Sequence, residues 1–289
     1  MIWNFGSINI DHVYTLDVMP KPGETLAALD YARHLGGKGV NQSIAIERAG
    51  GNVTHVGAVG PDGDWALSQM ENLAHDCIAQ VESPTGNAVI YVDSAGENQI
   101  VILGGANQAI PSEQRQKVFQ NAKEGDWVLF QNEVNDGPSI AREAKAAGLK
   151  IAYSAAPFDA DVALPLLEQI DFLAVNETEA ADLAKAAGRD VQDLGVPQLL
   201  MTKGADGAEF YAYGTVYSQA AFRVTPVDST GAGDTFLGAF LARLTAGEDA
   251  QSALRFAAAA SAIQVTRQGA ANAIPTFTET MEFLETQDG

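Results

Sequence analysis

Short apolar runs alternate with amphipathic segments along most of this 289-residue chain. The apolar runs have the length of buried strands and lie at residues 2–8, 53–59, 127–131, 151–154, 172–175 and 199–202. Segments with helical periodicity separate them, at residues 40–49, 65–74, 112–122, 138–147 and 178–186. Because strands joined through helices pack most simply in parallel, the pattern predicts a three-layer α/β/α sandwich with a mainly parallel central sheet.

Two stretches break this alternation, because strand-like runs follow each other there without a helix between them. They pair residues 12–18 with 25–35, and residues 88–92 with 100–103. We expect a small β-sheet lid built from about residues 10–35 and 86–104; an antiparallel extension of the main sheet is the alternative. We see no linker, so residues 1–289 are expected to form a single domain with this lid as an insertion.

Charge and composition exclude several classes of protein. The chain has 37 acidic and 17 basic residues, a net charge of −20, and 46% hydrophobic residues. An acid excess of this size repels phosphate backbones and anionic lipids, so we expect neither a nucleic-acid partner nor a membrane partner. No apolar run approaches the ~18 residues of a membrane-spanning helix, and the first residues lack the features of a secretory signal. We therefore expect a cytoplasmic protein.

Cysteine and histidine usage excludes further chemistry. The single Cys77 cannot form an internal disulfide, and its neighbours indicate a buried, inert thiol. The histidines show no spacing typical of zinc ligands, and no Gly-x-Ser-x-Gly nucleophile turn is present. Zinc hydrolases and serine esterases are therefore disfavoured.

Residues 228–236, Asp-Ser-Thr-Gly-Ala-Gly-Asp-Thr-Phe, are the most informative segment. Small residues leave the backbone amides accessible where a helix begins, and amides at a helix N-terminus bind anions. Asp234 in the first turn is also compatible with simple compensation of the helix dipole. The Gly-Ala-Gly run directly before it favours an anion site beside a carboxylate, which suits removal of a proton from a hydroxyl during phosphoryl transfer.

A second glycine-rich turn at residues 36–42, Gly-Gly-Lys-Gly-Val-Asn-Gln, also opens a helix. It does not match the Walker loop, because Ala32 stands at the first glycine position and Gly39 follows the lysine. A flexible turn with a solvated Lys38 and Asn41 is the alternative interpretation.

With these two segments, further short motifs follow in a fixed order along nearly the whole chain. They are Gly-Ser-Ile-Asn-Ile-Asp-His at 6–12, Pro-Gly-Glu-Thr at 22–25, Gly-Ala-Asn at 105–107, Asn-Glu-Thr-Glu at 176–179, Thr-Lys-Gly at 202–204 and Val-Thr-Arg-Gln-Gly-Ala at 265–270. In their number and order they resemble the ribokinase-like (PfkB) carbohydrate kinases, and most closely the ribose-phosphorylating members of that family.

The resemblance implies a catalytic role for the 228–236 segment. Asp234 matches the family's catalytic base, and the amides of Gly231, Ala232 and Gly233 match its anion hole. ATP and Mg²⁺ are the implied cofactors. Phosphoryl transfer depends mainly on positioning and charge stabilisation, which agrees with this arrangement.

The sugar site implied by the resemblance is polar. Its positions are Asn9, Asp11, Gly37, Lys38, Asn41 and Glu133, together with Asp234. Glu133 follows a predicted strand, where ligands of α/β sheets bind, and a solvated loop acid is the alternative. Carboxylates accept hydrogen bonds from hydroxyls and repel phosphate, so Asp11 and Glu133 favour a neutral sugar over a phosphosugar.

The resemblance also implies nucleotide and metal positions. Asn176 and Glu179 match a motif whose glutamate places Mg²⁺ through water, and a helix-capping box is the alternative role of the same pair. Thr202, Gly204 and Gly233 match positions near ATP.

A monovalent-cation site is the last implied feature. Its positions are Asp228, Thr230, Gln264, Arg267 and Gly269. The chain departs from the family at Ala273, where a serine hydroxyl is usual, so K⁺ is expected only as a possible activator.

The expected function is transfer of the γ-phosphoryl group of Mg-ATP to a primary hydroxyl of a neutral sugar, with D-ribose as the first substrate. A kinase for fructose, deoxyribose or a nucleoside is the nearest alternative, and a non-catalytic sugar-binding regulator is the alternative from another class. The resemblance further implies a homodimer formed through the lid.

Overall fold

The computed structural model describes residues 1–70 and 72–287, and within them nine strands form one sheet in the order β13-β12-β11-β10-β9-β8-β1-β4-β5. Its strands are β1 (Ile2–Phe5), β4 (Val53–Val59), β5 (Ile78–Gln80), β8 (Trp127–Gln131), β9 (Lys150–Ser154), β10 (Phe172–Asn176), β11 (Gln198–Thr202), β12 (Ala208–Ala212) and β13 (Thr215–Gln219). Pairing is parallel from β11 to β5 and antiparallel at β12 and β13.

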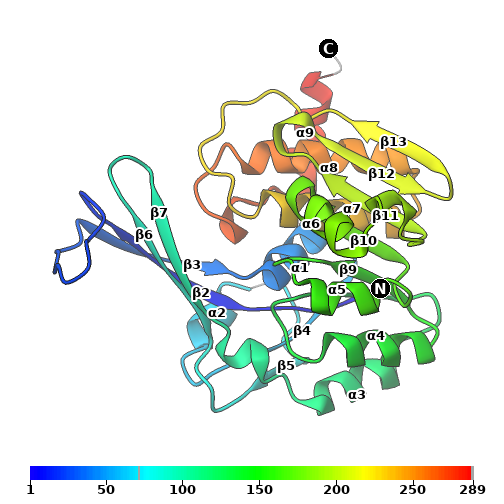
Figure 1. The fold of residues 1–289 in the computed structure, drawn as a ribbon, viewed down its shortest axis with the longest axis horizontal. Coiled ribbons are helices and arrows are strands. Elements are labelled where there is room, and N and C mark those ends of the chain that lie inside the picture. The colour runs from blue at the N-terminus through cyan, green and yellow to red at the C-terminus, as the bar shows by residue number, and fades with distance from the viewer. Residues whose placement is uncertain (71, 288–289) are drawn as a thin grey trace.

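Helices cover both faces of this sheet (Figure 1). One face carries α3 (Ser112–Asn121), α4 (Gly137–Ala146), α5 (Ala160–Leu166) and α6 (Glu177–Ala187); the other carries α1 (Lys38–Arg48), α7 (Ala232–Thr245) and α8 (Ala250–Gln264), with α9 (Phe277–Gln287) packed on α8. The strand β8 shows why two cores form, because Val128 and Phe130 join the first while Trp127 and Leu129 join the second. The predicted α/β/α sandwich is therefore confirmed.

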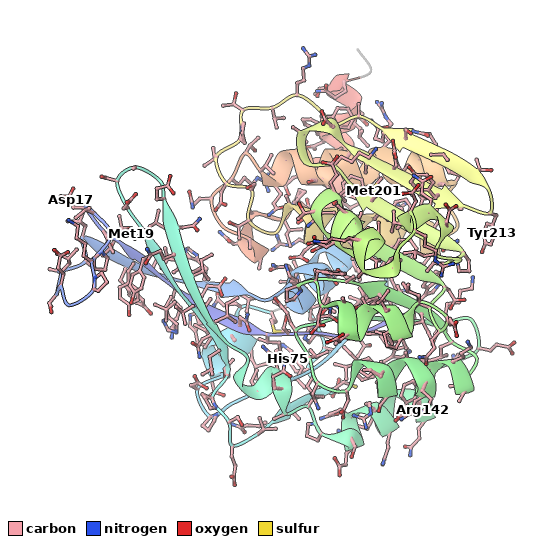
Figure 2. All side chains as sticks on the ribbon, in the orientation of Figure 1. Asp17, Met19, His75, Arg142, Met201 and Tyr213 are labelled. Carbon is pink, nitrogen blue, oxygen red and sulfur yellow. The ribbon has the colours of Figure 1, made fainter. Side chains whose placement is uncertain are left out.

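A second sheet of four strands lies beside the sandwich, in the order β3-β2-β6-β7. It consists of β2 (Asn9–Thr15), β3 (Asp30–Gly36), β6 (Gly86–Val92) and β7 (Asn98–Leu103). In Figure 1 it extends away from the helices, and Figure 2 places Asp17 and Met19 at its far tip. The small sheet is therefore separate, and the alternative of an antiparallel extension of the main sheet is wrong.

Several element boundaries differ from the sequence prediction. In the small sheet, the strands expected at residues 12–18 and 25–35 are β2 (Asn9–Thr15) and β3 (Asp30–Gly36). The first strand was expected over residues 2–8, but β1 ends at Phe5 and the chain crosses to β2 at Asn9. This crossing passes so close to α1 that a Cβ atom on Gly39 would lie 2.2 Å from Gly6 Cα. The helix expected over residues 65–74 is shorter, because α2 (Asp64–Ser68) ends where the Ser68 hydroxyl donates to Trp65 O at 2.7 Å.

The strand and helix ends gather at one edge of the main sheet. The carboxyl ends of β1, β8, β10 and β11 lie near the N-termini of α1, α6 and α7, which is where open α/β sheets bind their ligands. None of the helices in residues 1–70 and 72–287 is long and apolar enough to span a bilayer.

Candidate active site

Asp234 is the third residue of α7, and its carboxylate is held by two side chains of α1. Its Oδ1 accepts a hydrogen bond from Gln42 Nε2 at 2.8 Å, and its Oδ2 accepts one from Asn41 Nδ2 at 3.2 Å. The helix begins after Gly231, whose φ of 75° lies in the left-handed region that favours glycine. The glycine turn thus directs the first amides of α7 and the Asp234 carboxylate into the same space.

The surroundings of Asp234 change its acidity in opposite directions. Burial raises the pKa of its carboxyl and the charge of Glu133 raises it further, while Lys38 and the two amide donors lower it. The net effect is a raised pKa, which brings the carboxylate closer to the strength required of a general base. Asp234 in turn is the main cause of a raised pKa at Lys38, which therefore stays positively charged.

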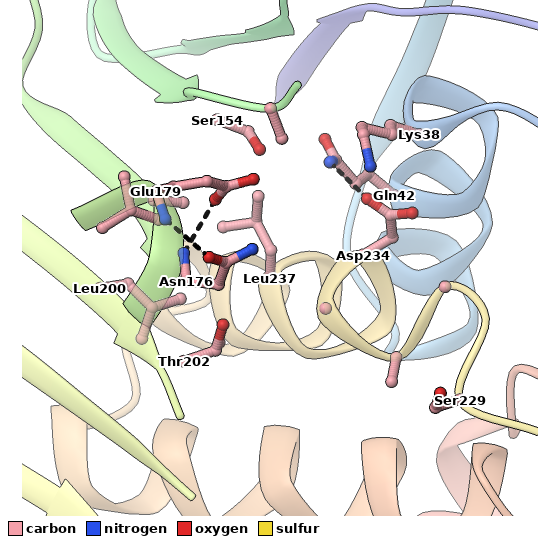
Figure 3. A pocket seen from close by; sticks show the side chains of 16 residues that line it. Lys38, Gln42, Ser154, Asn176, Glu179, Leu200, Thr202, Ser229, Asp234 and Leu237 are labelled. Carbon is pink, nitrogen blue, oxygen red and sulfur yellow. Dashed lines mark hydrogen bonds between the residues drawn. The ribbon is translucent and has the colours of Figure 1, made fainter. Parts of the chain in front are cut away.

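A cavity of about 210 Å³ lies between these groups and the N-terminus of α6. It is lined by the side chains of Lys38, Gln42, Asp234, Asn176 and Glu179 and by the turn at residues 231–233. Figure 3 shows Lys38, Gln42 and Asp234 on one side, with Asn176 and Glu179 facing them. A Cβ atom on Gly233 would meet nothing within 4 Å, so the backbone at this turn is open to a ligand.

Asn176 and Glu179 do form the capping box that the sequence offered as an alternative. Asn176 Oδ1 accepts from Glu179 N at 2.9 Å, and Glu179 Oε2 accepts from Asn176 N at 2.8 Å. Burial raises the pKa of Glu179 and Asp234 adds to this, while the Asn176 amide and Lys38 lower it. The glutamate is thus both a helix cap and a pocket carboxylate.

A second cavity of about 660 Å³ continues from the first, sharing Thr202, Ser229, Ala232 and Gly233 with it. Its walls are mainly apolar and include Val224, Pro226, Phe236, Ala258 and Val265. Gly204 lies in this cavity and not in the smaller one. The apolar walls could not be predicted from the sequence, because their residues come from a loop and two helices without a shared motif.

The polar positions proposed for the sugar meet near the start of α1. Glu133 Oε2 accepts from Ser7 Oγ at 2.5 Å and from Lys38 N at 3.0 Å, and Ser7 Oγ accepts from Gly39 N at 3.1 Å. Glu133 and Ser7 therefore satisfy the first amides of α1 from outside the helix. The alternative of a freely solvated Glu133 is wrong, and Ser7 is a contributor that the sequence analysis missed.

Asp11 and Asn9 lie on β2, the strand that leads away from this point. Burial, with the Glu133 charge adding to it, raises the pKa of Asp11 to about 7. Asn9 is buried, and its Oδ1 accepts from Asn107 Nδ2 at 2.7 Å. Asn107 belongs to the Gly-Ala-Asn motif at residues 105–107, which is the sequence signal that could have identified this contact.

The proposed monovalent-cation positions are only partly brought together. Asp228 accepts from the backbone and hydroxyl of Thr230 and from Gly269 N, and Gln264 Nε2 donates to Thr230 O at 2.5 Å. The Arg267 side chain turns away toward Glu279 and the Ala273 carbonyl. Gln264 Oε1 is buried and has no hydrogen-bond partner in the described chain, so one buried oxygen here fits a cation.

Within the described residues, no three His, Cys, Asp or Glu side chains form a cluster able to hold a metal by themselves. Glu179 nevertheless offers a carboxylate to the pocket while using Oε2 for the Asn176 amide. This donor chemistry fits Mg²⁺, which takes few protein carboxylates and keeps waters or phosphate oxygens as its other ligands.

Comparison with known proteins gives one consistent result. The family described as "pfkB family carbohydrate kinase" matches residues 1–277. The ribokinase of Haemophilus influenzae is 34% identical over 299 residues, covering 97% of each chain. The structure of Arabidopsis thaliana ribokinase complexed with ribose and ATP superposes with a TM-score of 0.87 at 30% identity, covering 98% of this chain and 97% of that one.

The Thermotoga maritima ribokinase structure gives a TM-score of 0.86 at 31% identity and covers 98% of both chains. Both the whole-chain coverage and the agreement between sequence and structure exclude a partial match. This chain therefore belongs to the PfkB family of carbohydrate kinases.

Proposed function

We propose that this chain is an ATP-dependent ribose kinase, which transfers the γ-phosphoryl group of Mg-ATP to the 5-hydroxyl of D-ribose. The observation that carries the proposal is the position of the Asp234 carboxylate. It lies in one pocket with the open turn at residues 231–233, next to the polar groups at the start of α1. The relatives above that are named ribokinases support ribose as the substrate.

The sugar would lie beside Asn9, Asp11, Asn41 and Glu133, with the Gly37–Lys38 turn next to it. These groups supply hydrogen-bond acceptors and amide donors, which match the hydroxyls of an uncharged sugar. Because two of them are carboxyl groups close together, an anionic phosphosugar is disfavoured at the same place.

Asp234 would accept the proton of the attacking hydroxyl as the oxygen–phosphorus bond forms. The amides of Gly231, Ala232 and Gly233 would donate hydrogen bonds to the phosphoryl oxygens, where negative charge is concentrated during transfer. Lys38 adds a positive charge at the same place, and its raised pKa keeps it protonated.

ATP would occupy both cavities. The apolar walls of the larger cavity suit a nucleobase, Thr202 and Gly204 would lie near the ribose and phosphates, and the phosphates would extend toward Gly233. Bound Mg²⁺ would neutralise phosphate charge, and Glu179 and Asn176 are the residues that would hold it, chiefly through water.

A monovalent cation would be held by Asp228, the Gln264 side-chain oxygen and the carbonyls of Thr230, Arg267 and Gly269. It would stabilise the turn that carries the anion hole. Ala273 supplies no hydroxyl, so activation by K⁺ is proposed as partial.

The small sheet would act as a lid that closes over the sugar and excludes water, which limits hydrolysis of ATP. We also propose that two copies of the chain associate through this lid, and that the enzyme works in the cytoplasm.

The substrate is tested by measuring ADP release with Mg-ATP and each of D-ribose, 2-deoxyribose, D-fructose, adenosine and fructose 6-phosphate. We expect ribose to give the highest kcat/KM, and potassium to exceed tetramethylammonium as the salt. Turnover with another member of the panel alone would replace the substrate. Sugar-dependent thermal stabilisation without any ADP release would instead support a binding-only regulator.

A further inference from the structure

A chain of buried side-chain amides leads from the interior of the sandwich to the Asp234 carboxylate. We define Asn4, Gln131 and Gln42 as the amide relay. Gln42 Nε2 donates to Asp234 Oδ1 at 2.8 Å, Gln131 Nε2 donates to Gln42 Oε1 at 2.7 Å, and the same nitrogen donates to Asn4 Oδ1 at 2.9 Å. All three side chains are at most 1% exposed, so water does not compete for these bonds.

Backbone carbonyls fix the direction of every bond in the relay. Asn4 Nδ2 lies 2.8 Å from Gly39 O, a carbonyl that can only accept, so the Asn4 amide nitrogen must face it. Asn4 Oδ1 then faces Gln131, which must present its nitrogen. That nitrogen uses its second proton on Gln42 Oε1, and the Gln42 nitrogen is left facing Asp234.

The branch beyond Asn4 enforces the same direction. Asn4 Nδ2 also donates to Ser43 Oγ at 2.8 Å, and Ser43 Oγ lies 2.9 Å from His55 Nδ1. His55 Nε2 lies 3.1 Å from Gly6 O, another carbonyl, so the imidazole carries its proton there and accepts from Ser43 at Nδ1. Burial lowers the pKa of His55 to about 4, so this neutral tautomer persists throughout the neutral range.

From this geometry we propose that the amide relay is a positioning device for the phosphoryl-transfer base. It keeps Oδ1 of Asp234 a permanent acceptor. Oδ2, whose bond from Asn41 Nδ2 is longer at 3.2 Å, is left as the oxygen that receives the substrate proton, because no side chain among the described residues holds the Asn41 oxygen. A free glutamine could rotate its amide and accept a hydrogen bond from a protonated Oδ1. Gln42 is prevented from doing so because its own oxygen is held by Gln131. The inference rests on the proposed kinase function.

The relay acts together with the charges that face Asp234. These are Lys38 on α1, Glu133 after β8 and Glu179 on α6. Gln131 is hydrogen-bonded to Asn4 and Gln42 and to none of these charged side chains; it lies at the end of β8 and does not line either cavity. A change at Gln131 therefore tests the relay without removing a pocket group.

The test compares Gln42→Met, Gln131→Met and the matched control Gln114→Met, which replaces a buried glutamine of α3 far from Asp234 in the fold. The replacements are similar in size. For each variant the dependence of kcat on pH is measured with saturating sugar and ATP, together with both KM values and the melting temperature.

Removing a donor that favours the charged form raises the pKa of the base. We expect the acidic limb of kcat to move up by about one pH unit in Gln42→Met and by less in Gln131→Met. Activity should fall about tenfold on the acidic side and recover at high pH, with both KM values within about twofold. Gln114→Met should leave the limb in place.

A relay that served only packing would leave the acidic limb of kcat where it is, whether the substitutions lower the melting temperature or reduce kcat equally at all pH values. An unmoved limb in both relay variants overturns the proposal. The Asp234 carboxyl can also be titrated by carbon-13 NMR on aspartate-labelled protein, with Asp234→Asn identifying the signal. This readout decides the relay even if no sugar is phosphorylated, so failure of the kinase proposal and failure of the relay are distinguishable.

Discussion

Asp11 and Asp234 both have a raised pKa, and burial is the first cause in each case. Their partners differ. Asp234 receives two amide donors and the attraction of Lys38, whereas no donor among the described residues bonds the Asp11 carboxyl, which faces the negative Glu133. The same residue type is therefore a weak acid at one position, while at the other we propose that it serves as a base.

Asp11 should make the free protein less stable as pH rises. Its carboxyl ionises near 3.8 in the unfolded chain and near 7 in the folded chain, so between these values the folded state binds more protons. Stability from this group is present below about pH 4 and is lost toward pH 7. We expect the free energy of unfolding of Asp11→Asn to exceed that of the wild type by about 4 kcal/mol at pH 8, with the gap closing by pH 4.

Urea unfolding at pH 4, 6 and 8 measures this gap, and Asp17→Asn at the exposed tip of the small sheet is the control. A gap between wild type and Asp11→Asn that does not change with pH would contradict the assignment.

The sequence identified Asp234 and its glycine turn because they are contiguous, and adjacency in the chain is enough to place amides beside a carboxylate. Gln131 was not identified, because it lies 89 residues from Gln42 and is brought to it only by the pairing of β8 with β1. The raised pKa of Asp11 also could not be predicted from the sequence, since it depends on burial and on the nearby charge of Glu133.

At the scale of elements, α6 combines a structural and a chemical role in one side chain. Glu179 closes the capping box with Asn176 and also lines the smaller cavity, where we propose that Mg-ATP binds. Two substitutions separate these roles. Glu179→Gln removes the charge of the side chain but keeps its capping oxygen, whereas Asn176→Ala removes the other half of the capping box.

We expect Glu179→Gln to change the free energy of unfolding by less than about 0.5 kcal/mol and to raise the Mg²⁺ concentration for half-maximal activity several-fold. Asn176→Ala should lose about 1 kcal/mol of stability, and Asn176→Ser should keep most of it. Chemical denaturation and Mg²⁺ titration at fixed ATP measure both effects. If Glu179→Gln destabilises the protein as much as Asn176→Ala does and leaves the Mg²⁺ dependence unchanged, the residue is a cap alone.

Most buried strands were predicted from sequence because both of their faces are apolar. The strands β12 and β13 were not, since β13 is largely exposed and β12 is only half-buried, which leaves no apolar run. Both ends of helix α7 could be predicted from the sequence, because a glycine-rich turn precedes it and Gly247 follows it.

At the scale of the whole molecule, the small sheet exposes an unusual apolar strand. Ile100, Val101, Ile102 and Leu103 of β7 are 51%, 66%, 63% and 51% exposed. Four consecutive exposed apolar residues on an edge strand favour association with another copy of the chain. This agrees with the proposed dimer through the lid.

Light scattering at micromolar concentration should therefore give the mass of a dimer, and Ile102→Asp should shift it toward the 30.4 kDa monomer. Tyr213→Asp is the control, because Tyr213 is 80% exposed on the opposite side of the molecule (Figure 2). A wild-type protein that is monomeric under these conditions would rule out the lid dimer.

The central claim is that Asp234 serves as the base in phosphoryl transfer to a neutral sugar. Ribose-dependent ADP release by the wild type and by Asp234→Asn, measured side by side with Mg-ATP, tests it most directly. We expect strong turnover in the wild type and a kcat at least ~10²-fold lower in the variant, with similar melting temperatures. Near-normal kcat in Asp234→Asn would contradict it.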